Sequence, residues 1–382
     1  MGKFYFIPGT YIPNTAATNR WLAYLKFFSK NGIDTTVVFF RSDENRDVLN
    51  ETDNIRVLNL WRKYSTKFTI SFYVCLLLEY CKFWFKLKSG DVVYCYEQAN
   101  LWRFFMKKGV RLYSEYTEHP DIIGYGGSVF KISKRSFLKK CNKLSGLFVI
   151  STPLKELFLY YGMPKDKVHI ANMIVDCDRF NGCEKNITEK PYMAYCGSIS
   201  KSKDGVDDLI RSFSIFHKAF PQEMLYLIGS SSSKTELNEL KKLTDELNIS
   251  EYVIFTGTIN SNQIPQYLIN ADLLLLDRPN NKQAKYGFPT KLGEYLLSGT
   301  PVVVTDVGDV SVFLTDGVNA FVAKSSDPET FAEKMVLAFE DYKRSSAIGQ
   351  KGKEMAIENF SSEKVSRFMV SIMFSNNYQS VN

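Results

Sequence analysis

The segment from Gly287 to Val304 carries the residue pattern best suited to binding an anionic ligand. It reads as a loop, a helix, a glycine-containing turn and a buried strand. Pro289 and Thr290 stand where the helix should begin, and the backbone N–H groups at a helix start favour a phosphate. Glu294 follows one turn later, on the face of Thr290, where a carboxylate can accept two hydrogen bonds from a ribose diol. The alternative is an ordinary capped helix with Glu294 in solvent.

Short apolar runs that alternate with amphipathic stretches must position this segment. They predict strands at 4–7, 35–40, 91–96, 111–114 and 148–150, and then at 192–196, 224–228, 253–255, 273–276 and 301–305. The rhythm is that of parallel sheets covered by helices. We therefore expect an α/β protein with two Rossmann-like, doubly wound domains that face a cleft, since such sheets bind ligands beyond the carboxyl ends of their strands.

A polar stretch near 178–191 interrupts the apolar periodicity and suggests the boundary between the two domains. We predict an N-terminal acceptor-side domain over 1–180 and a C-terminal nucleotide-binding domain over 181–360. The last segment, 361–382, should contain a helix that packs back on the N-terminal domain.

The composition is that of a folded protein. Of the 382 residues, 45% are hydrophobic and 23% are charged, which excludes disordered, collagen-like and coiled-coil chains. Seven cysteines without a CxxC pair and three scattered histidines argue against a disulfide framework and a structural zinc site. The beginning of the sequence lacks the apolar region of a secretory signal, so we expect a cytoplasmic location.

The net charge of +7 is unevenly distributed along the chain. The first 180 residues hold 27 Lys and Arg against 16 Asp and Glu, whereas the remainder is mildly acidic. Basic residues cluster with apolar ones between 130 and 143, and aromatic residues are dense over 68–87. We expect this surface to rest on anionic lipid at the inner leaflet. Core aromatics beside solvated lysines are the alternative. Glu79, Lys82 and Lys86 argue against a membrane span, and no binding module indicates nucleic acid.

Several motifs together resemble the family 4 glycosyltransferases, which are retaining enzymes of the GT-B fold. The segment 287–304 resembles their C-terminal signature, E-x7-E followed by a helix and G-x-P-V-V. The stretches 149–155, 161–168 and 175–180 resemble the approach to the second domain. The stretches 255–257, 270–272 and 316–321 resemble later strands and turns. The likeness is good in the C-terminal half and loose in the N-terminal half.

The resemblance implies a donor site in the second domain. Glu294 falls on the glutamate that binds the nucleotide ribose, and Tyr286 stands where a glutamate usually contacts the donor sugar. Lys203 falls on the lysine that binds the diphosphate, whereas Ser198 replaces the usual arginine. Lys201 or the helix start at Thr290 would then meet part of the phosphate charge. The predicted donor-binding residues are Glu294, Thr290, Pro289, Lys291, Gly197, Ser198 and Tyr286.

The resemblance also implies site residues in the first domain. His119 resembles the histidine that positions the donor sugar, and Glu118 is a second candidate. With Lys203, these form the predicted catalytic set. Thr15 and Ala16 open a helix after a loop that resembles the acceptor loop, although the usual paired glycines are missing.

The function implied is transfer of a sugar, with retention, from a nucleoside diphosphate donor to a hydroxyl of a glycan or lipid-linked acceptor, in bacterial surface polysaccharide assembly. The acceptor would attack on the face that the diphosphate leaves, with no protein nucleophile, no cofactor and no metal. A nucleotide-sugar epimerase and an inactive homologue that binds nucleotide sugar or a partner enzyme remain alternatives. The departures at Tyr286 and Ser198 favour the inactive homologue.

Overall fold

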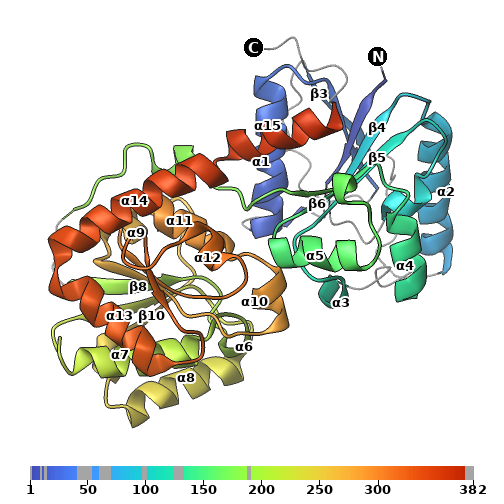
Figure 1. The fold of residues 1–382 in the computed structure, drawn as a ribbon. Coiled ribbons are helices and arrows are strands. Elements are labelled where there is room, and N and C mark those ends of the chain that lie inside the picture. The colour runs from blue at the N-terminus through green and yellow to red at the C-terminus, as the bar shows by residue number, and fades with distance from the viewer. Residues whose placement is uncertain are drawn as a thin grey trace. The chain divides into compact units, whose positions relative to one another are not determined.

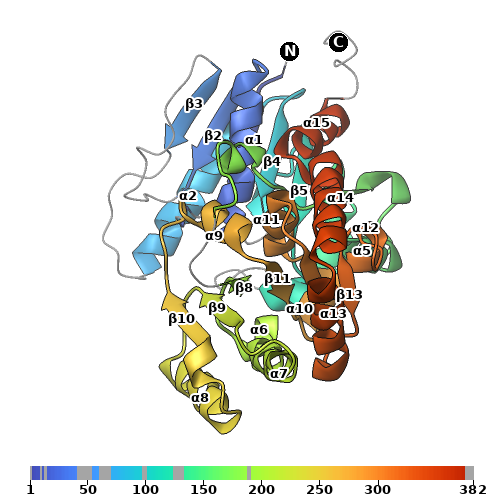
Figure 2. The ribbon, with the colours of Figure 1, turned by 90° about the vertical axis from the view of Figure 1, so that its left-hand side faces the viewer.

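The computed structural model describes residues 2–8, 11–12, 15–40, 54–59, 70–96, 101–123, 133–186 and 191–374. The chain divides into two compact units (Figures 1 and 2). Unit 1 comprises Met1–Asn172 together with Ser362–Asn382, and unit 2 comprises Met173–Ser361. Each unit is built around its own parallel sheet, as the alternating sequence pattern predicts.

Unit 1 contains a seven-stranded sheet in the order β3-β2-β1-β4-β5-β6-β7. All of its strand pairs are parallel. The strands are β1 (Phe4–Ile7), β2 (Thr35–Phe39), β3 (Ile55–Asn59), β4 (Val92–Tyr96), β5 (Arg111–Tyr116), β6 (Gly146–Val149) and β7 (Val168–Ile170). The helices are α1 (Ala16–Lys30), α2 (Ile70–Lys86), α3 (Pro120–Ile123), α4 (Lys134–Cys141), α5 (Thr152–Tyr160) and α15 (Ser362–Met373), with short 3-10 turns at Leu101–Phe104 and Lys165–Lys167.

The C-terminal helix α15 is part of unit 1, where it packs on α1 and β6. Arg111 donates a hydrogen bond from Nη1 to the carbonyl of Met373 at 3.0 Å. The ring of Phe374 meets that of Phe4 edge to face, with the centroids 5.3 Å apart. These contacts fasten a helix from the far end of the sequence to the central strands of the sheet.

Unit 2 contains a six-stranded parallel sheet in the order β10-β9-β8-β11-β12-β13. Its strands are β8 (Tyr192–Cys196), β9 (Met224–Ile228), β10 (Val253–Gly257), β11 (Leu273–Leu276), β12 (Val302–Thr305) and β13 (Phe321–Ala323). Its helices are α6 (Lys201–Asp204), α7 (Val206–His217), α8 (Lys234–Glu246), α9 (Ile264–Asn270), α10 (Lys282–Tyr286), α11 (Thr290–Ser298), α12 (Val310–Phe313), α13 (Pro328–Glu340) and α14 (Tyr342–Phe360), with 3-10 turns at Cys177–Phe180 and Ser250–Tyr252.

The order of the strands in unit 2 fixes where a ligand can bind. From β8 the chain winds outward through β9 to β10, and it then returns to β11 on the other side of β8. The direction of winding therefore reverses between β8 and β11, and ligands of such sheets bind beyond the carboxyl ends of the two strands at this point. The loops after Cys196 and Leu276 begin there.

The division between the units falls after Asn172, earlier than the predicted boundary after Phe180. The segment from Met173 is bound into unit 2 because Val175 donates its backbone N–H to the carbonyl of Phe360 at 2.8 Å. Met173 and Val175 also lie against Gly293 in α11, so closely that an added Cβ would stand 2.2 Å from Met173 Cε. A glycine inside this helix therefore permits the close contact.

Among the described helices, none combines the length and apolar character needed to cross a membrane. Helix α2 instead has two different faces. One face carries the buried residues Leu76, Tyr80 and Phe83, followed by the buried Leu87 directly after the helix. The other face exposes Val74, Leu77, Leu78 and Phe85.

Candidate functional site

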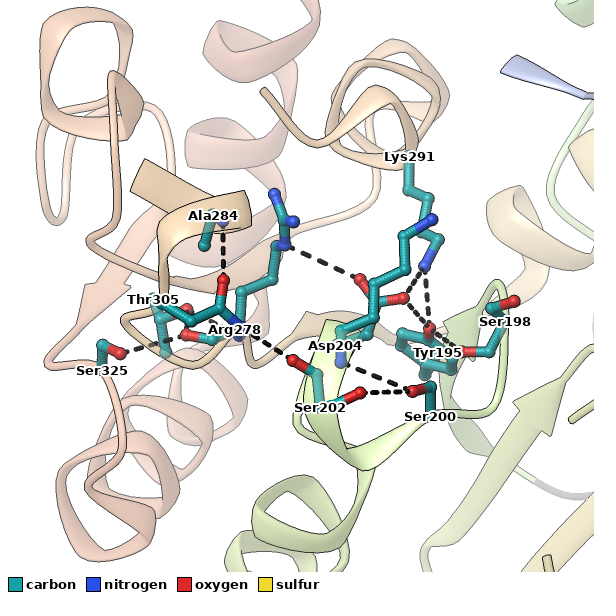
Figure 3. Close-up of polar contacts among 12 residues, drawn as sticks. Tyr195, Ser198, Ser200, Ser202, Asp204, Arg278, Ala284, Lys291, Thr305 and Ser325 are labelled. Carbon is teal, nitrogen blue, oxygen red and sulfur yellow. Dashed lines mark hydrogen bonds and ion pairs between the residues drawn. The ribbon is translucent and has the colours of Figure 1, made fainter. Parts of the chain in front are cut away.

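The loop after β8 and the short helix α6 form one wall of the candidate site (Figure 3). Gly197 and Ser198 continue directly from the strand, and Ser198 is exposed. The aliphatic part of Lys291 lies so close to Gly197 that a Cβ there would stand 2.1 Å from Lys291 Cε. Gly197 thus gives Lys291 room to cross the loop toward α6, and the two predicted donor-binding residues are brought together.

Asp204, the last residue of α6, is the buried acid at the centre of this wall. Lys291 Nζ lies 2.5 Å from its Oδ2, and Tyr195 donates a hydrogen bond to the same oxygen at 3.1 Å. Arg278 Nε lies 3.7 Å from Oδ1. One carboxylate therefore holds an ammonium and a guanidinium, and Figure 3 shows the side chains of both residues converging on it.

Positively charged side chains lie close together in this cluster. Burial lowers the pKa of Lys291, Asp204 opposes that shift, and the nearby cations Lys203 and Arg278 lower the pKa further. Lys203 itself is exposed, and its backbone N–H donates to Ser200 Oγ at 3.4 Å. Two cations thus pair with Asp204, and Lys203 lies close enough to Lys291 to lower its pKa; this local positive charge favours an added anion.

Lys201 does not join this cluster. Its ammonium pairs with Glu239, and its backbone N–H donates to Glu236 Oε1 at 2.8 Å. We expected Lys201 to compensate for the missing arginine at position 198, but its ammonium is already paired with Glu239 of α8.

Helix α11 forms the second wall. Pro289 is its buried N-cap residue, and no side chain caps the helix start at Thr290. Tyr295 anchors the helix to the end of β8, since its hydroxyl accepts from the backbone N–H of Cys196 at 2.5 Å and donates to the carbonyl of that residue at 3.1 Å. The N-terminus of α11 is thereby held at the carboxyl edge of the sheet, where a helix start favours anions.

Glu294 lies one turn into α11, as the spacing predicts, but it has a protein partner. It forms an ion pair with Nη1 of Arg179, whose Nη2 donates to the carbonyl of Ser261 at 2.9 Å. Burial raises the pKa of Glu294, and Arg179 counteracts that rise. The carboxylate is about 29% exposed, so a ligand can still reach it.

Tyr286 ends α10 and is half-buried. Its ring lies 5.7 Å from the ammonium of Lys285. An aromatic ring therefore occupies the position at which the family that the sequence resembles usually has a glutamate.

Asp277, directly after β11, is a second buried acid in unit 2. It is 1% exposed, and its Oδ2 has no hydrogen-bond partner among the described residues. Burial, together with the nearby carboxylates of Asp208 and Asp207, raises its pKa to about 8. At neutral pH this group is therefore largely protonated and adds little negative charge to the cluster.

In unit 1, His119 is buried in the loop after β5. Its Nδ1 accepts a hydrogen bond from the backbone N–H of Asp121 at 3.0 Å, so the ring serves as a cap for α3. Glu118 is half-exposed. The buried carboxylate of this segment is instead Glu115, which binds Arg20 Nε at 2.7 Å and accepts hydrogen bonds from Tyr24 and Tyr94.

Thr15 and Ala16 begin α1, where the resemblance places the acceptor loop. Thr15 is the N-cap residue, and its hydroxyl accepts from the backbone N–H of Thr18 at 3.3 Å. Ala16 is exposed. Thr15 therefore has a structural role at the start of this helix.

Three members of the site in unit 2 are not among the residues predicted from the sequence: Arg179, Asp204 and Arg278. Asp204 and Arg278 each follow a predicted element at the carboxyl edge of the sheet, which was a signal for Arg278 in particular. Within the part of the chain that the structure describes, no group of three or more His, Cys, Asp or Glu side chains is arranged to hold a metal ion.

Comparison with known proteins relates part of the chain to glycosyltransferases. Residues 182–355 match the family Glycosyl transferases group 1. Mannosylfructose-phosphate synthase from Agrobacterium fabrum is 26% identical over 222 residues, which cover 53% of this chain and 48% of that protein. A D-inositol 3-phosphate glycosyltransferase from Streptomyces avermitilis is 24% identical over 46% of this chain and 40% of its own. The chain thus spans about half the length of the curated relatives it matches.

Solved structures resemble almost the whole chain. A glycosyltransferase from Rickettsia africae aligns with a TM-score of 0.76 at 15% identity, covering 99% of this chain and 100% of its own. HepE from Anabaena, solved with UDP and glucose, aligns with a TM-score of 0.72 at 15% identity over 98% and 100%. The chain therefore has the GT-B fold, and its second unit contains a segment that matches the Glycosyl transferases group 1 family.

Proposed function

We propose that this protein is a glycosyltransferase that moves a sugar from a nucleoside diphosphate donor to an acceptor hydroxyl. The observation that carries the proposal is the cationic cluster around Asp204, which lies inside the segment that matches Glycosyl transferases group 1. The similarity to HepE, a structure that contains UDP and glucose, supports the same donor class.

Each wall of the site has a part in this proposal. Lys203 and the start of α11 neutralise the departing diphosphate, because charge on the bridging oxygen grows as the bond to the sugar breaks. Glu294 accepts hydrogen bonds from the ribose, and Arg179 holds its carboxylate in place for that contact. Gly197 and Ser198 offer backbone groups beside the phosphates, and Tyr286 lies toward the donor sugar.

We assign His119 to positioning the sugar, with Glu118 as the second candidate, and the backbone at Thr15 and Ala16 to the acceptor. The acceptor attacks on the face that the diphosphate leaves, so the anomeric configuration is retained without a protein nucleophile. No metal or other cofactor takes part. The acceptor is a glycan or a lipid-linked sugar in the assembly of a bacterial surface polysaccharide.

Release of nucleoside diphosphate from a panel of UDP- and GDP-sugars, with and without acceptors, tests the proposal. We expect the wild-type protein to release product slowly alone and faster with its acceptor. Glu294→Ala should weaken nucleotide binding about ten- to a hundred-fold, the effect of one charge-assisted hydrogen bond. Glu251→Ala, which removes an exposed carboxylate of the 3-10 turn at Ser250–Tyr252, is the matched control and should bind normally.

A wild-type protein that binds UDP or GDP but releases no product from any nucleotide sugar would support the inactive homologue instead. Unchanged nucleotide affinity in Glu294→Ala would contradict the ribose assignment. The anomeric configuration of the product, read from proton couplings by NMR, decides between retention and inversion.

We also propose that unit 1 works on the cytoplasmic face of a membrane without crossing it. The exposed stripe of α2 carries Val74, Leu78 and Phe85 at helical spacing, and Phe85 is 75% exposed. Lys82 and Lys86 on the same helix are exposed too. An apolar stripe bordered by lysines suits a lipid surface that carries negative charge.

The residues predicted to form the lipid surface are partly exposed and partly buried in the structure. On α4, Lys134, Arg135 and Lys139 are exposed while Phe137 is fully buried. On α2, Tyr80 and Phe83 belong to the core, as does Leu87. Phe68, Phe130, Lys131 and Ile132 lie outside the described residues, as do the side chains of Phe72 and Tyr73. The aromatic residues are thus partly core, and the exposed stripe of α2 carries the proposal.

Co-sedimentation with vesicles tests this second proposal. The protein should bind vesicles that contain anionic lipid and be released by high salt. The double variant Leu78→Ser, Phe85→Ser should lose most of this binding, whereas Ile357→Ser, which changes an exposed apolar residue of α14 in unit 2, should not. Equal recovery of wild type and double variant would refute the role of the stripe.

A further inference from the structure

Gly229 follows β9 and lies directly against the loop after β8. A Cβ added to Gly229 would stand 1.8 Å from the carbonyl oxygen of Gly197 and 2.9 Å from the carbon of that carbonyl. The two distances differ by 1.1 Å, which is nearly the length of a C=O bond, ~1.23 Å. The Gly197 carbonyl therefore points straight at the place that a side chain of residue 229 would fill. Gly229 is held there from the other side, since its N–H donates to the carbonyl of Gly257 at 3.1 Å.

The direction of this carbonyl decides where the next backbone N–H points. A trans peptide unit is planar, and its C=O and N–H point in opposite directions. The N–H of Ser198 therefore points away from Gly229 and from β9. The amides on either side, those of Gly197 and Ile199, donate to carbonyl groups at and just after the end of β9, at 2.8 and 3.0 Å. Among the residues that the structure describes, none accepts a hydrogen bond from the N–H of Ser198, and Ser198 is exposed.

The N–H of Ser198 lies on the side of β8 that carries the candidate site. β8 stands between β9 and β11, and a direction away from β9 leads toward the point where the winding of the sheet reverses. The hydroxyl of Tyr195 donates to the carbonyl of Ser198 at 2.6 Å and accepts from Nζ of Lys291 at 2.8 Å (Figure 3). A backbone N–H and an ammonium are thus both present beside this loop, and together they suit an anionic oxygen.

We propose that Gly229 is a positioning residue for the donor: the absence of a side chain at 229 keeps the peptide unit between Gly197 and Ser198 in the orientation that presents the Ser198 N–H to a phosphate oxygen. The proposal rests on the proposed function for the identity of the donor. A side chain at 229 would turn the carbonyl of Gly197 aside, and the N–H of Ser198 would turn with it because both belong to one rigid plane. The contact with the phosphate would then be lost without a change in any charge.

Amide hydrogen exchange, resolved by NMR on the full chain, tests the contact directly. Without ligand, the amide of Ser198 should exchange near its intrinsic rate, whereas the amides of Gly197 and Ile199 should be protected by their existing hydrogen bonds. Saturating inorganic pyrophosphate or UDP should slow exchange at Ser198 about ten-fold or more and leave the two neighbours nearly unchanged. An exchange rate at Ser198 that changes with neither compound overturns the proposal.

Gly229→Ala tests the positioning role by calorimetric titration. It should weaken the binding of pyrophosphate and UDP about ten- to a hundred-fold, the effect of one hydrogen bond to a charged group. It should also abolish the slowing of exchange at Ser198. Gly182→Ala is the matched control, because Gly182 likewise has a positive φ, 76° against 141° at Gly229, but its added Cβ would meet nothing within 4 Å. Both variants strain the backbone, and only Gly229→Ala displaces the carbonyl of Gly197.

Thermal unfolding shows whether each variant is folded. A folded Gly229→Ala with wild-type affinity for pyrophosphate and UDP overturns the proposal, as does an equal loss of affinity in Gly182→Ala. If Gly229→Ala does not fold, the exchange rate of Ser198 in the wild-type protein decides.

Failure of the proposed function gives a different result. A wild-type protein whose Ser198 amide is protected by pyrophosphate, but which releases no nucleoside diphosphate from any nucleotide sugar, would keep the role of Gly229 and lose the transferase. A protein that transfers sugar, and whose Gly229→Ala variant has a wild-type Michaelis constant for the donor, would keep the transferase and lose the role of Gly229.

Discussion

Replacing Asp277 by asparagine should change how the stability of unit 2 depends on pH. Asp277 is 1% exposed, and burial raises its pKa to about 8, whereas an aspartate in an unfolded chain has a pKa of ~3.9. Between these two values the folded protein keeps a proton that the unfolded chain releases. The free energy of unfolding therefore falls as the pH rises through this window.

The size of the change in the free energy of unfolding follows from the pKa shift of Asp277. Each pH unit inside the window lowers the free energy of unfolding by at most ~1.4 kcal/mol. Between pH 5 and pH 7 the free energy of unfolding therefore falls by about 2–3 kcal/mol. The full shift counts because the carboxyl group is buried and solvent does not screen it. Asparagine does not titrate, so the stability of Asp277→Asn relative to wild type should rise by this amount over the same interval. Glu223, whose pKa burial raises to about 7, contributes equally to both proteins and cancels in the difference.

Hydrogen exchange of the β11 and β8 amides is the suitable assay, because it reports the opening of unit 2 separately from that of unit 1. Wild type and Asp277→Asn should be compared at pH 5, 6 and 7, after correction for the intrinsic exchange rate. Glu358→Gln, which neutralises an exposed carboxylate of α14, is the control and should run parallel to wild type. A constant difference between wild type and Asp277→Asn across this range would refute the buried, protonated state of Asp277.

Three further predictions concern unit 2 and the proposed reaction. Lys203→Ala should reduce turnover more than donor affinity, because the cation acts on charge that develops as the sugar leaves; a raised Michaelis constant with full turnover would contradict this. Gly293→Ala should lower the free energy of unfolding by about 1–3 kcal/mol, since the new Cβ would stand 2.4 Å from Val175 Cγ1; Met173→Ala in the same chain should recover part of that loss in thermal unfolding. Dialysis against EDTA should leave nucleoside diphosphate release unchanged, and restoration of lost activity by manganese or magnesium would show a metal requirement.

The sequence was most informative about strands that are buried on both faces. The strands predicted at Phe4–Ile7 and Leu273–Leu276 have those bounds in the structure, because a central strand of a parallel sheet is a continuous apolar run. The strands that were not predicted, β3, β7 and β13, all lie at the edges of their sheets. An edge strand has one neighbour and needs fewer apolar residues, so its pattern is weaker.

The site could be predicted only as far as local motifs reach. Lys203 and Glu294 belong to short sequence patterns, and both lie near the carboxyl edge of the sheet in unit 2, as those patterns predict. The group formed by Asp204, Arg278 and Lys291 depends on β11 lying beside β8, which no local pattern states. The pairing of Glu294 with Arg179 likewise depends on where the chain enters unit 2.

The position of α15 has a consequence for the order in which this protein folds during synthesis. Unit 2 is complete in the first 361 residues to be synthesised, whereas unit 1 still lacks the helix that covers α1 and β6. Translation proceeds at about 5–20 residues per second, and domains generally fold as units from the N-terminal end. Here the first unit in the sequence must wait with part of its apolar surface uncovered while the second one is made. A released chain that ends at Ser361 should therefore show a protease-resistant unit 2 joined to a protease-sensitive unit 1, and chaperones that recognise exposed apolar segments should bind its N-terminal part.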